Sequence, residues 1–388
     1  MQSLSDLQQD KQNIVIALTV KMTSLGFDAR FVRVIEGPVV TQYFFKPLPT
    51  SPLAKIMSRT EDIALSVGAE SVLIQRIKDE ISISIPTIPR TVINFDTCLH
   101  WLCTHQYDKK QTSTEKMDLG LLMGQDTTGN NFSLDLARQP HILIAGSTGS
   151  GKSVFLSQLI TSLVTQKSER ELKFILVDTK QLDLTLFSTL PHVVECIDKI
   201  DKLHATMDRL LKIVRQRTEK MKGLARNIRE YNTLCSNIGE KELPYYVVVI
   251  DELADVIGQD KELAKDESKD DKRTRIAVSL ASLAQISRAS GIHIIAATQR
   301  PSIQIISGDI KTNFPTRISF KLPTSVDSRV ILDENGAECL LGRGDYLFKT
   351  AESSEVKRAH SAFVSMTDIA TVLSQHEAIR KTFASIQV

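Results

Sequence analysis

Apolar residues in the first 105 positions follow two kinds of spacing. They recur at helical spacing over residues 14–22 and 56–65, and the first of these segments stops at Gly26. Four short runs rich in β-branched and aromatic residues predict strands, at 31–35, 39–45, 72–77 and 80–85. Turn residues separate the members of each pair. The pattern predicts a small α+β domain over residues 1–105.

The spacing changes after this segment. Residues 106–118 are mostly polar and without an apolar period, which predicts a linker, and a hairpin turning at 128–131 follows. Helical segments then alternate with compact apolar runs, at 142–145, 174–178, 246–251, 292–298 and 317–320. Long helices are expected at 201–232 and 274–290. This alternation predicts an α/β domain over residues 119–388, built on a mainly parallel sheet.

The strand predicted at 142–145 leads directly into a glycine-rich segment that fits the pattern G-x-x-x-x-G-K-[ST]. Its residues are Gly146, Ser147, Thr148, Gly149, Ser150, Gly151, Lys152 and Ser153. In such a loop the backbone N–H groups converge on a phosphate, and the following helix adds its positive end. We expect Lys152 to contact the β- and γ-phosphates of ATP and Ser153 to bind Mg²⁺. A glycine-rich turn without a ligand is the alternative, and the flanking apolar strand and helix argue against it.

Acidic and polar residues end the neighbouring predicted strands. Asp251 is expected to hold Mg²⁺ through its water shell, and Glu252 to activate a water for attack on the γ-phosphate. Two acidic capping residues are the alternative. Gln299 ends the next strand, where its amide can report whether ATP or ADP is bound. Asp178 ends another strand, either as support for this site or as a helix cap.

The composition is 42% hydrophobic and 24% charged over 388 residues, typical of a globular protein with two or three domains. A net charge of +2 gives no global basic field, so any nucleic-acid site has to come from local clusters. Five scattered cysteines and no secretory leader favour a reducing, cytoplasmic setting. No run approaches the roughly 20 apolar residues of a membrane span, so we expect a soluble protein. Cys98, Cys103 and His105 lack a fourth ligand at zinc-site spacing.

Seven further motifs accompany the phosphate loop. They are GPVVTQY at 37–43, ILVDTK at 175–180, VVVIDELAD at 247–255, RASGIHIIAATQRPS at 288–302, IKTNFPTRISFKL at 310–322, DSRVILD at 327–333 and GAECLLGRGDYLF at 336–348. In this order, from near Arg30 to near Ser365, the chain resembles the FtsK/SpoIIIE family of double-stranded DNA translocases.

The resemblance implies a ring-shaped homohexamer with a RecA-like P-loop motor domain that uses ATP and Mg²⁺ to pump double-stranded DNA. It implies that Arg288 is an arginine finger, supplied to ATP bound by the neighbouring subunit. It also directs Arg300, Lys311 and Arg329 toward the central pore and the DNA phosphates, with solvated surface residues as the alternative. One departure bears on the grip on DNA, because Ser325 stands where the family often has a pore lysine.

Two family segments have no counterpart in these 388 residues: the membrane-spanning amino-terminal region and the winged-helix module that reads oriented DNA sequences. We therefore expect either an excised or miniature translocase or a motor whose direction is set by a separate DNA-sequence-reading or recombinase partner. Two other functions stay open. A conjugative or secretion-type coupling ATPase usually inserts an all-helical domain, for which residues 178–251 leave little room. An ATP-regulated DNA-binding protein without translocation fits Glu252 less well.

Overall fold

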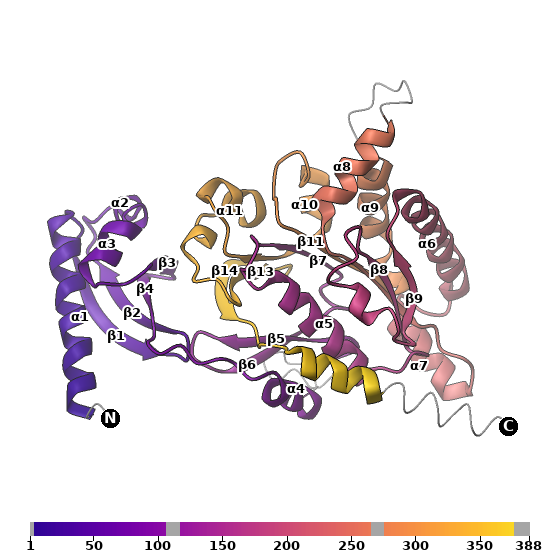
Figure 1. The fold of residues 1–388 in the computed structure, drawn as a ribbon, viewed down its shortest axis with the longest axis horizontal. Coiled ribbons are helices and arrows are strands. Elements are labelled where there is room, and N and C mark those ends of the chain that lie inside the picture. The colour runs from indigo at the N-terminus through magenta and orange to yellow at the C-terminus, as the bar shows by residue number, and fades with distance from the viewer. Residues whose placement is uncertain (1–3, 106–116, 265–274, 376–388) are drawn as a thin grey trace.

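The computed structural model describes residues 4–105, 117–264 and 275–375, and Figure 1 shows a small sheet at one end of the long axis and a large sheet at the other. The small part contains α1 (Leu4–Ser24), β1 (Ala29–Glu36), β2 (Val40–Pro47), α2 (Leu53–Met57), α3 (Thr60–Ser66), β3 (Leu73–Ile77) and β4 (Glu80–Pro86). Its four strands pair antiparallel in the order β1-β2-β4-β3. The α+β prediction for this segment is confirmed.

The large sheet has ten strands in the order β6-β5-β14-β13-β12-β7-β11-β10-β8-β9. Their bounds are β5 (Gly120–Asp126), β6 (Asn131–Asp135), β7 (His141–Ala145), β8 (Leu172–Val177), β9 (Val193–Ile197), β10 (Tyr245–Ile250), β11 (Ile292–Thr298), β12 (Thr316–Phe320), β13 (Asp345–Thr350) and β14 (Ser353–His360). The neighbours from β12 to β9 are all parallel, whereas β13, β14, β5 and β6 pair antiparallel. The expected mainly parallel sheet is confirmed.

Helices cover both faces of this sheet (Figure 1). The helices of this part are α4 (Phe95–Thr104), α5 (Lys152–Gln166), α6 (Ile200–Met221), α7 (Ile228–Ile238), α8 (Leu253–Ala264), α9 (Arg275–Ile286), α10 (Gly308–Asn313) and α11 (Ser325–Leu332), with short 3₁₀ turns η1 (Thr185–Phe187), η2 (Arg288–Ser290) and η3 (Ala337–Cys339). Successive residues of β7 face opposite cores: Ile142 packs with α4 and α5, and Leu143 with α6, α8 and α9. A parallel strand buried on both faces explains its continuous apolar run.

The predicted single helix over 201–232 is wrong, because the structure divides it into α6 and α7. Gly223 adopts a left-handed φ of 76° just after α6, a conformation that a helix cannot continue through. Asn227 then caps α7, since its side chain accepts a hydrogen bond from the backbone N–H of Glu230. The amphipathic period continues across the break, and this hides it in the sequence.

The sequence analysis did not predict the helix α4 or the hairpin formed by β13 and β14. The division into domains stays a prediction, because most of the linker predicted at 106–118 lies outside the described residues. Of the described helices, none is both long enough and apolar enough to cross a membrane.

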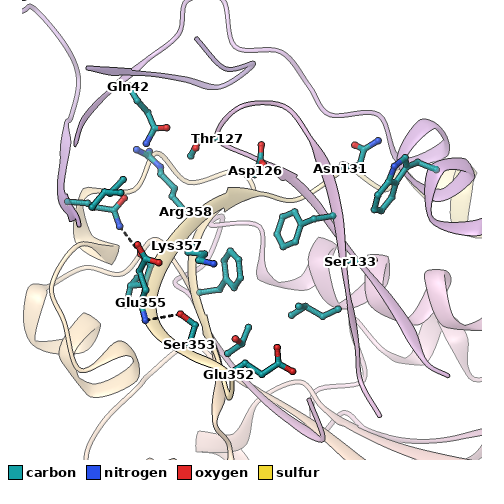
Figure 2. Close-up of a pocket in the computed structure, with 18 of the residues that line it drawn as sticks. Gln42, Asp126, Thr127, Asn131, Ser133, Glu352, Ser353, Glu355, Lys357 and Arg358 are labelled. Carbon is teal, nitrogen blue, oxygen red and sulfur yellow. Dashed lines mark hydrogen bonds between the residues drawn. The ribbon is translucent and has the colours of Figure 1, made fainter. Parts of the chain in front are cut away.

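The small sheet meets the large one at β3 and β14, where the Gln75 Nε2 group donates to the Val356 carbonyl at 3.3 Å. A cavity of about 670 Å³ opens beside this contact (Figure 2). Gln42 of β2, Trp101 of α4, Asn131 of β6 and Arg358 of β14 line it. None of the predicted phosphate-loop or catalytic residues is among the described residues that line this cavity.

A buried ion pair joins the two strands of the β13–β14 hairpin. Arg358 donates to both carboxylate oxygens of Asp345, at 2.9 and 2.6 Å, and the side chains are only 2% and 1% exposed. His360 Nδ1 lies 3.1 Å from the same carboxylate. Burial alone would raise the pKa of Asp345, but the charge and hydrogen bonds of Arg358 outweigh it and hold the pKa well below its ordinary value of 3.8.

We predict that Arg358→Leu lowers the apparent free energy of unfolding by about 3–5 kcal/mol at pH 7, because it leaves a buried carboxylate without its main partner. Urea unfolding at several pH values measures this. The folded pKa of Asp345 is depressed in the parent, so the stabilisation is present above the ordinary carboxyl pKa and is lost as pH falls below it. In the variant the buried carboxyl takes up a proton more readily, so the deficit narrows as pH falls from 7 toward 4.

Lys46→Ala is the control, since it breaks the exposed pair between Lys46 and Asp79. It should change stability little at any of these pH values. An Arg358→Leu variant as stable as the parent at pH 7 would contradict the role of the buried pair.

Candidate nucleotide-binding site

The glycine-rich segment forms a loop between the carboxyl end of β7 and the start of α5. Gly149 and Gly151 have left-handed φ angles of 76° and 110°, and Gly151 immediately precedes the first residue of the helix, Lys152. A Cβ on Gly151 would stand 2.5 Å from the backbone nitrogen of Gly344, and one on Gly146 would stand 2.7 Å from the Cβ of Phe320. The backbone conformation therefore favours glycine at Gly149, the lack of space favours it at Gly146, and both reasons apply at Gly151.

The loop fits a phosphate ligand in two respects. The positive end of the 15-residue helix α5 begins at the loop, as an anion site requires. The hydroxyl of Ser150 is buried and has no hydrogen-bond partner among the described residues. A buried polar atom without a partner is unusual and suggests that a ligand completes the loop.

Lys152 is buried and ion-paired. Its Nζ lies 2.8 Å from Oδ1 of Asp251 and 2.8 Å from the Asp251 backbone carbonyl. The two side chains are 3% and 6% exposed. The structure thus brings together the predicted phosphate-binding cation and the predicted metal ligand, and each neutralises the other.

Glu252 is held by the adjacent strand β11. Its Oε1 accepts from the Thr298 hydroxyl at 2.6 Å, and its Oε2 accepts from the backbone N–H of Gln299 at 2.9 Å. The Gln299 Oε1 in turn accepts from the Thr148 hydroxyl of the phosphate loop at 3.1 Å. The two predicted residues Glu252 and Gln299 therefore lie together beside the loop, at the carboxyl ends of β10 and β11.

Two aspartates that follow β8, Asp178 and Asp183, lie in the segment next to the phosphate loop. Ser153 donates its hydroxyl to the Asp183 carboxylate, a contact that the sequence patterns did not indicate. The Asp178 carboxylate accepts from the backbone N–H of Leu184 at 2.9 Å. Asp178 caps no described helix, because the next helical turn, η1, begins only at Thr185 and has no side-chain cap. Its contact with Leu184 instead fixes the segment that carries Asp183.

Arg288 lies at the amino-terminal ends of the parallel strands, opposite the phosphate loop, which follows the carboxyl end of β7. It belongs to η2, which precedes β11, whereas Gln299 follows the end of that seven-residue strand. At the usual rise per residue, a strand of this length separates its ends by about 20 Å. The Arg288 guanidinium donates to the Arg138 carbonyl at 3.4 Å, and it lines a hollow of about 320 Å³ with Arg138 and Arg229. The structure does not bring Arg288 to the phosphate loop of its own chain.

The three residues predicted to contact DNA lie on different elements: Arg300 follows β11, Lys311 is in α10 and Arg329 is in α11. Arg300 and Arg329 are exposed, and the Arg329 Nε donates to the Ser325 carbonyl at 3.5 Å. Lys311 is bound to Asp333 at 2.9 Å, and Asp333 also accepts from Arg317 and Lys349. Burial would raise the pKa of Asp333, but hydrogen bonds from Lys349 and Lys311 hold it well below its ordinary value. Sequence motifs missed this cluster because its members lie on separate elements.

Comparison with known proteins gives matches along most of the chain. The FtsK/SpoIIIE family matches residues 104–303, and the FtsK alpha domain matches residues 2–87. The DNA translocase FtsK of Helicobacter pylori strain J99 is 34% identical over 364 residues, covering 92% of this chain and 40% of the relative. That of Campylobacter jejuni strain 81-176 is 33% identical over 386 residues, covering 96% and 38%. The chain spans about two fifths of the length of these relatives.

Solved structures agree on the fold. The pCW3 conjugation coupling protein TcpA, in a monomer form with ATPγS, superposes with a TM-score of 0.60 at 24% identity, over 94% of this chain and 99% of that one. The cytoplasmic domain of the Thermomonospora curvata type VII secretion ATPase EccC has a TM-score of 0.59 at 22% identity, over 74% and 34%. The phosphate loop, the large sheet and the matched residues lead to one conclusion: this chain belongs to the FtsK/SpoIIIE family and has its P-loop ATPase fold.

Proposed function

We propose that this chain is a motor that hydrolyses ATP and moves double-stranded DNA through a ring of six copies. The observation that carries the proposal is the arrangement of Lys152, Asp251 and Glu252 around the phosphate loop, in a chain 34% identical to a DNA translocase FtsK. Because such a motor works on DNA inside a cell, the proposal places the chain in the cytoplasm.

In the proposed reaction, the phosphates of ATP occupy the loop and Lys152 turns from Asp251 to their β- and γ-oxygens. The oxygen donors of Ser153 and Asp251 suit Mg²⁺, which neutralises developing phosphate charge when bound. Glu252 then takes the proton of the attacking water, because Thr298 and the Gln299 N–H fix the orientation of its carboxylate. The hydrogen bond from Thr148 to Gln299 couples the phosphate loop to the end of β11, so that loss of the γ-phosphate can change the position of that strand end.

Assembly is part of this proposal, because Arg288 can reach a phosphate loop only on another chain. A side chain at one edge of the sheet and a loop at the other create a head-to-tail interface, which closes into a ring when the rotation allows it. The number six comes from the family. A ring also concentrates a few basic residues from each copy around one channel, so a chain of net charge +2 can hold DNA phosphates. We propose Arg300, Lys311 and Arg329 for this role.

The direct test is steady-state ATP hydrolysis with and without linear duplex DNA. We predict that DNA stimulates turnover, and that rising salt weakens the stimulation because DNA phosphates regain their counterions. Lys152→Ala should be inactive with or without DNA, since the positive charge that acts on the β- and γ-phosphates is lost. Turnover that is indifferent to DNA would contradict a DNA motor and favour the coupling or secretion class.

A second prediction isolates the proposed base. Glu252→Gln should bind ATP like the parent and hydrolyse it about 10²- to 10⁴-fold more slowly, because its amide oxygen can accept from the Gln299 N–H and its NH₂ can donate to the Thr298 hydroxyl, but it cannot accept a proton. Nucleotide affinity and single-turnover hydrolysis measure the two effects separately. Glu61→Gln on the exposed side of α3 is the matched control and should match the parent in both. Hydrolysis at the parent rate in Glu252→Gln would mean that another residue activates the water.

A further inference from the structure

A tight turn at residues 342–344 lies directly against the phosphate loop. The Gly344 N–H donates to the Ser150 carbonyl at 2.9 Å. A Cβ on Gly342 would stand 4.0 Å from the Gly149 carbonyl oxygen. The backbone of this turn therefore contacts the outer, carbonyl side of the loop whose inner side is proposed to hold phosphate.

Arg343, the central residue of the turn, has a left-handed backbone with φ of 52°. The glycines on either side are also left-handed, with φ angles of 74° and 96°. This region is disfavoured for any residue with a Cβ, and an arginine there persists only because its surroundings hold it. They do so firmly, since Ser361 N–H donates to the Gly344 carbonyl at 2.8 Å and Leu341 N–H donates to the buried Asp345 at 2.8 Å. Strained residues of this kind concentrate at ligand clamps.

The side chain of Arg343 is available for a ligand. Gly342 and Gly344 are buried, whereas Arg343 is exposed. Among the described residues, its guanidinium makes no hydrogen bond or ion pair. A second cation lies close by, since the Lys321 Cδ is 3.9 Å from where a Cβ on Gly342 would stand. One flank of the phosphate loop thus carries two basic residues.

The order of strands indicates which part of a nucleotide this flank meets. In the sheet, β7 lies between β11 and β12. Glu252 and Gln299, which act at the γ-phosphate, follow β10 and β11 on one side of the loop. Lys321 follows β12 on the other side, and Arg343 precedes β13, which pairs antiparallel with β12 and so begins at the same edge. The flank with Arg343 therefore faces the end of the nucleotide away from the γ-phosphate, which ATP and ADP share.

We propose that Arg343 is a nucleotide-binding residue, whose guanidinium donates to a phosphate oxygen in the diphosphate shared by ATP and ADP. A guanidinium presents several N–H donors in a planar fork that matches phosphate, and hydrogen bonds between ions are stronger than neutral ones. The proposal rests on the proposed ATPase site and adds to it a residue that binds both nucleotides equally. Uniform binding of this kind lowers KM for ATP without changing the rate of the chemical step.

The test measures affinity for a fluorescent ADP and for ATPγS in Arg343→Gly, Arg343→Lys and the parent. In Arg343→Gly both affinities should fall by about tenfold or more, as expected for a lost charge-assisted hydrogen bond. KM for ATP should rise with kcat retained at saturating ATP. The melting temperature should stay level or rise, because glycine adopts a positive φ without strain. Arg343→Lys should lie between the two, since lysine keeps the charge but loses the fork.

Lys78→Gly is the matched control, because Lys78 is also basic, exposed and left-handed, with φ of 57°, but lies in the β3–β4 turn of the small sheet. It should reproduce the effect on melting temperature and leave nucleotide affinity unchanged. Equal ADP affinity in Arg343→Gly and the parent would overturn the inference and leave the proposed function standing. A loss of affinity accompanied by a lower melting temperature would overturn it too, by assigning Arg343 to loop folding. A parent chain that binds neither nucleotide would overturn both proposals.

Discussion

The polarity of the parallel sheet is the constraint on which the rest of the structure depends. All parallel strands from β12 to β9 point the same way, so their carboxyl ends form one edge and their amino ends the other. The phosphate loop, Asp251, Glu252 and Gln299 follow strand ends and meet at the first edge. Arg288 precedes a strand and lies at the second. Each chain therefore holds two halves of the proposed site that face in opposite directions.

Burial of charge at the first edge restricts what the site can do. Lys152 and Asp251 are nearly fully buried, and an ion removed from water needs a partner of opposite charge. In the proposed reaction Lys152 leaves Asp251 to pair with the phosphates, and Asp251 would then pair with Mg²⁺. Both buried charges would keep a partner of opposite charge. Glu252 needs no such exchange, because the Thr298 hydroxyl and the Gln299 N–H already donate to its oxygens.

The predictions from sequence succeeded where the signal is continuous along the chain. The loop from Gly146 to Ser153 and the buried strand before it could be predicted, because the glycine spacing and an apolar run lie in one segment. Asp183 could not, since only the fold of the segment after β8 brings it to Ser153. Gly223 ends α6 through its backbone conformation, while the apolar period carries on past it. The left-handed backbone conformation of Arg343 is likewise imposed by tertiary contacts, and it could not be predicted from the sequence GRGD.

A mixture of Arg288→Ala and Lys152→Ala chains tests most directly whether the two halves work across an interface. Arg288→Ala alone should lose on the order of 10³-fold in hydrolysis, and Lys152→Ala should be inactive. In rings assembled at random from equal amounts, about one head-to-tail interface in four joins an intact loop to an intact Arg288, so activity should return. A mixture of Lys152→Ala with Glu252→Gln should recover nothing, because both changes affect the same half of the site. The account predicts recovery in the first mixture alone, and a first mixture as inactive as Lys152→Ala, in rings shown to exchange subunits, would contradict it.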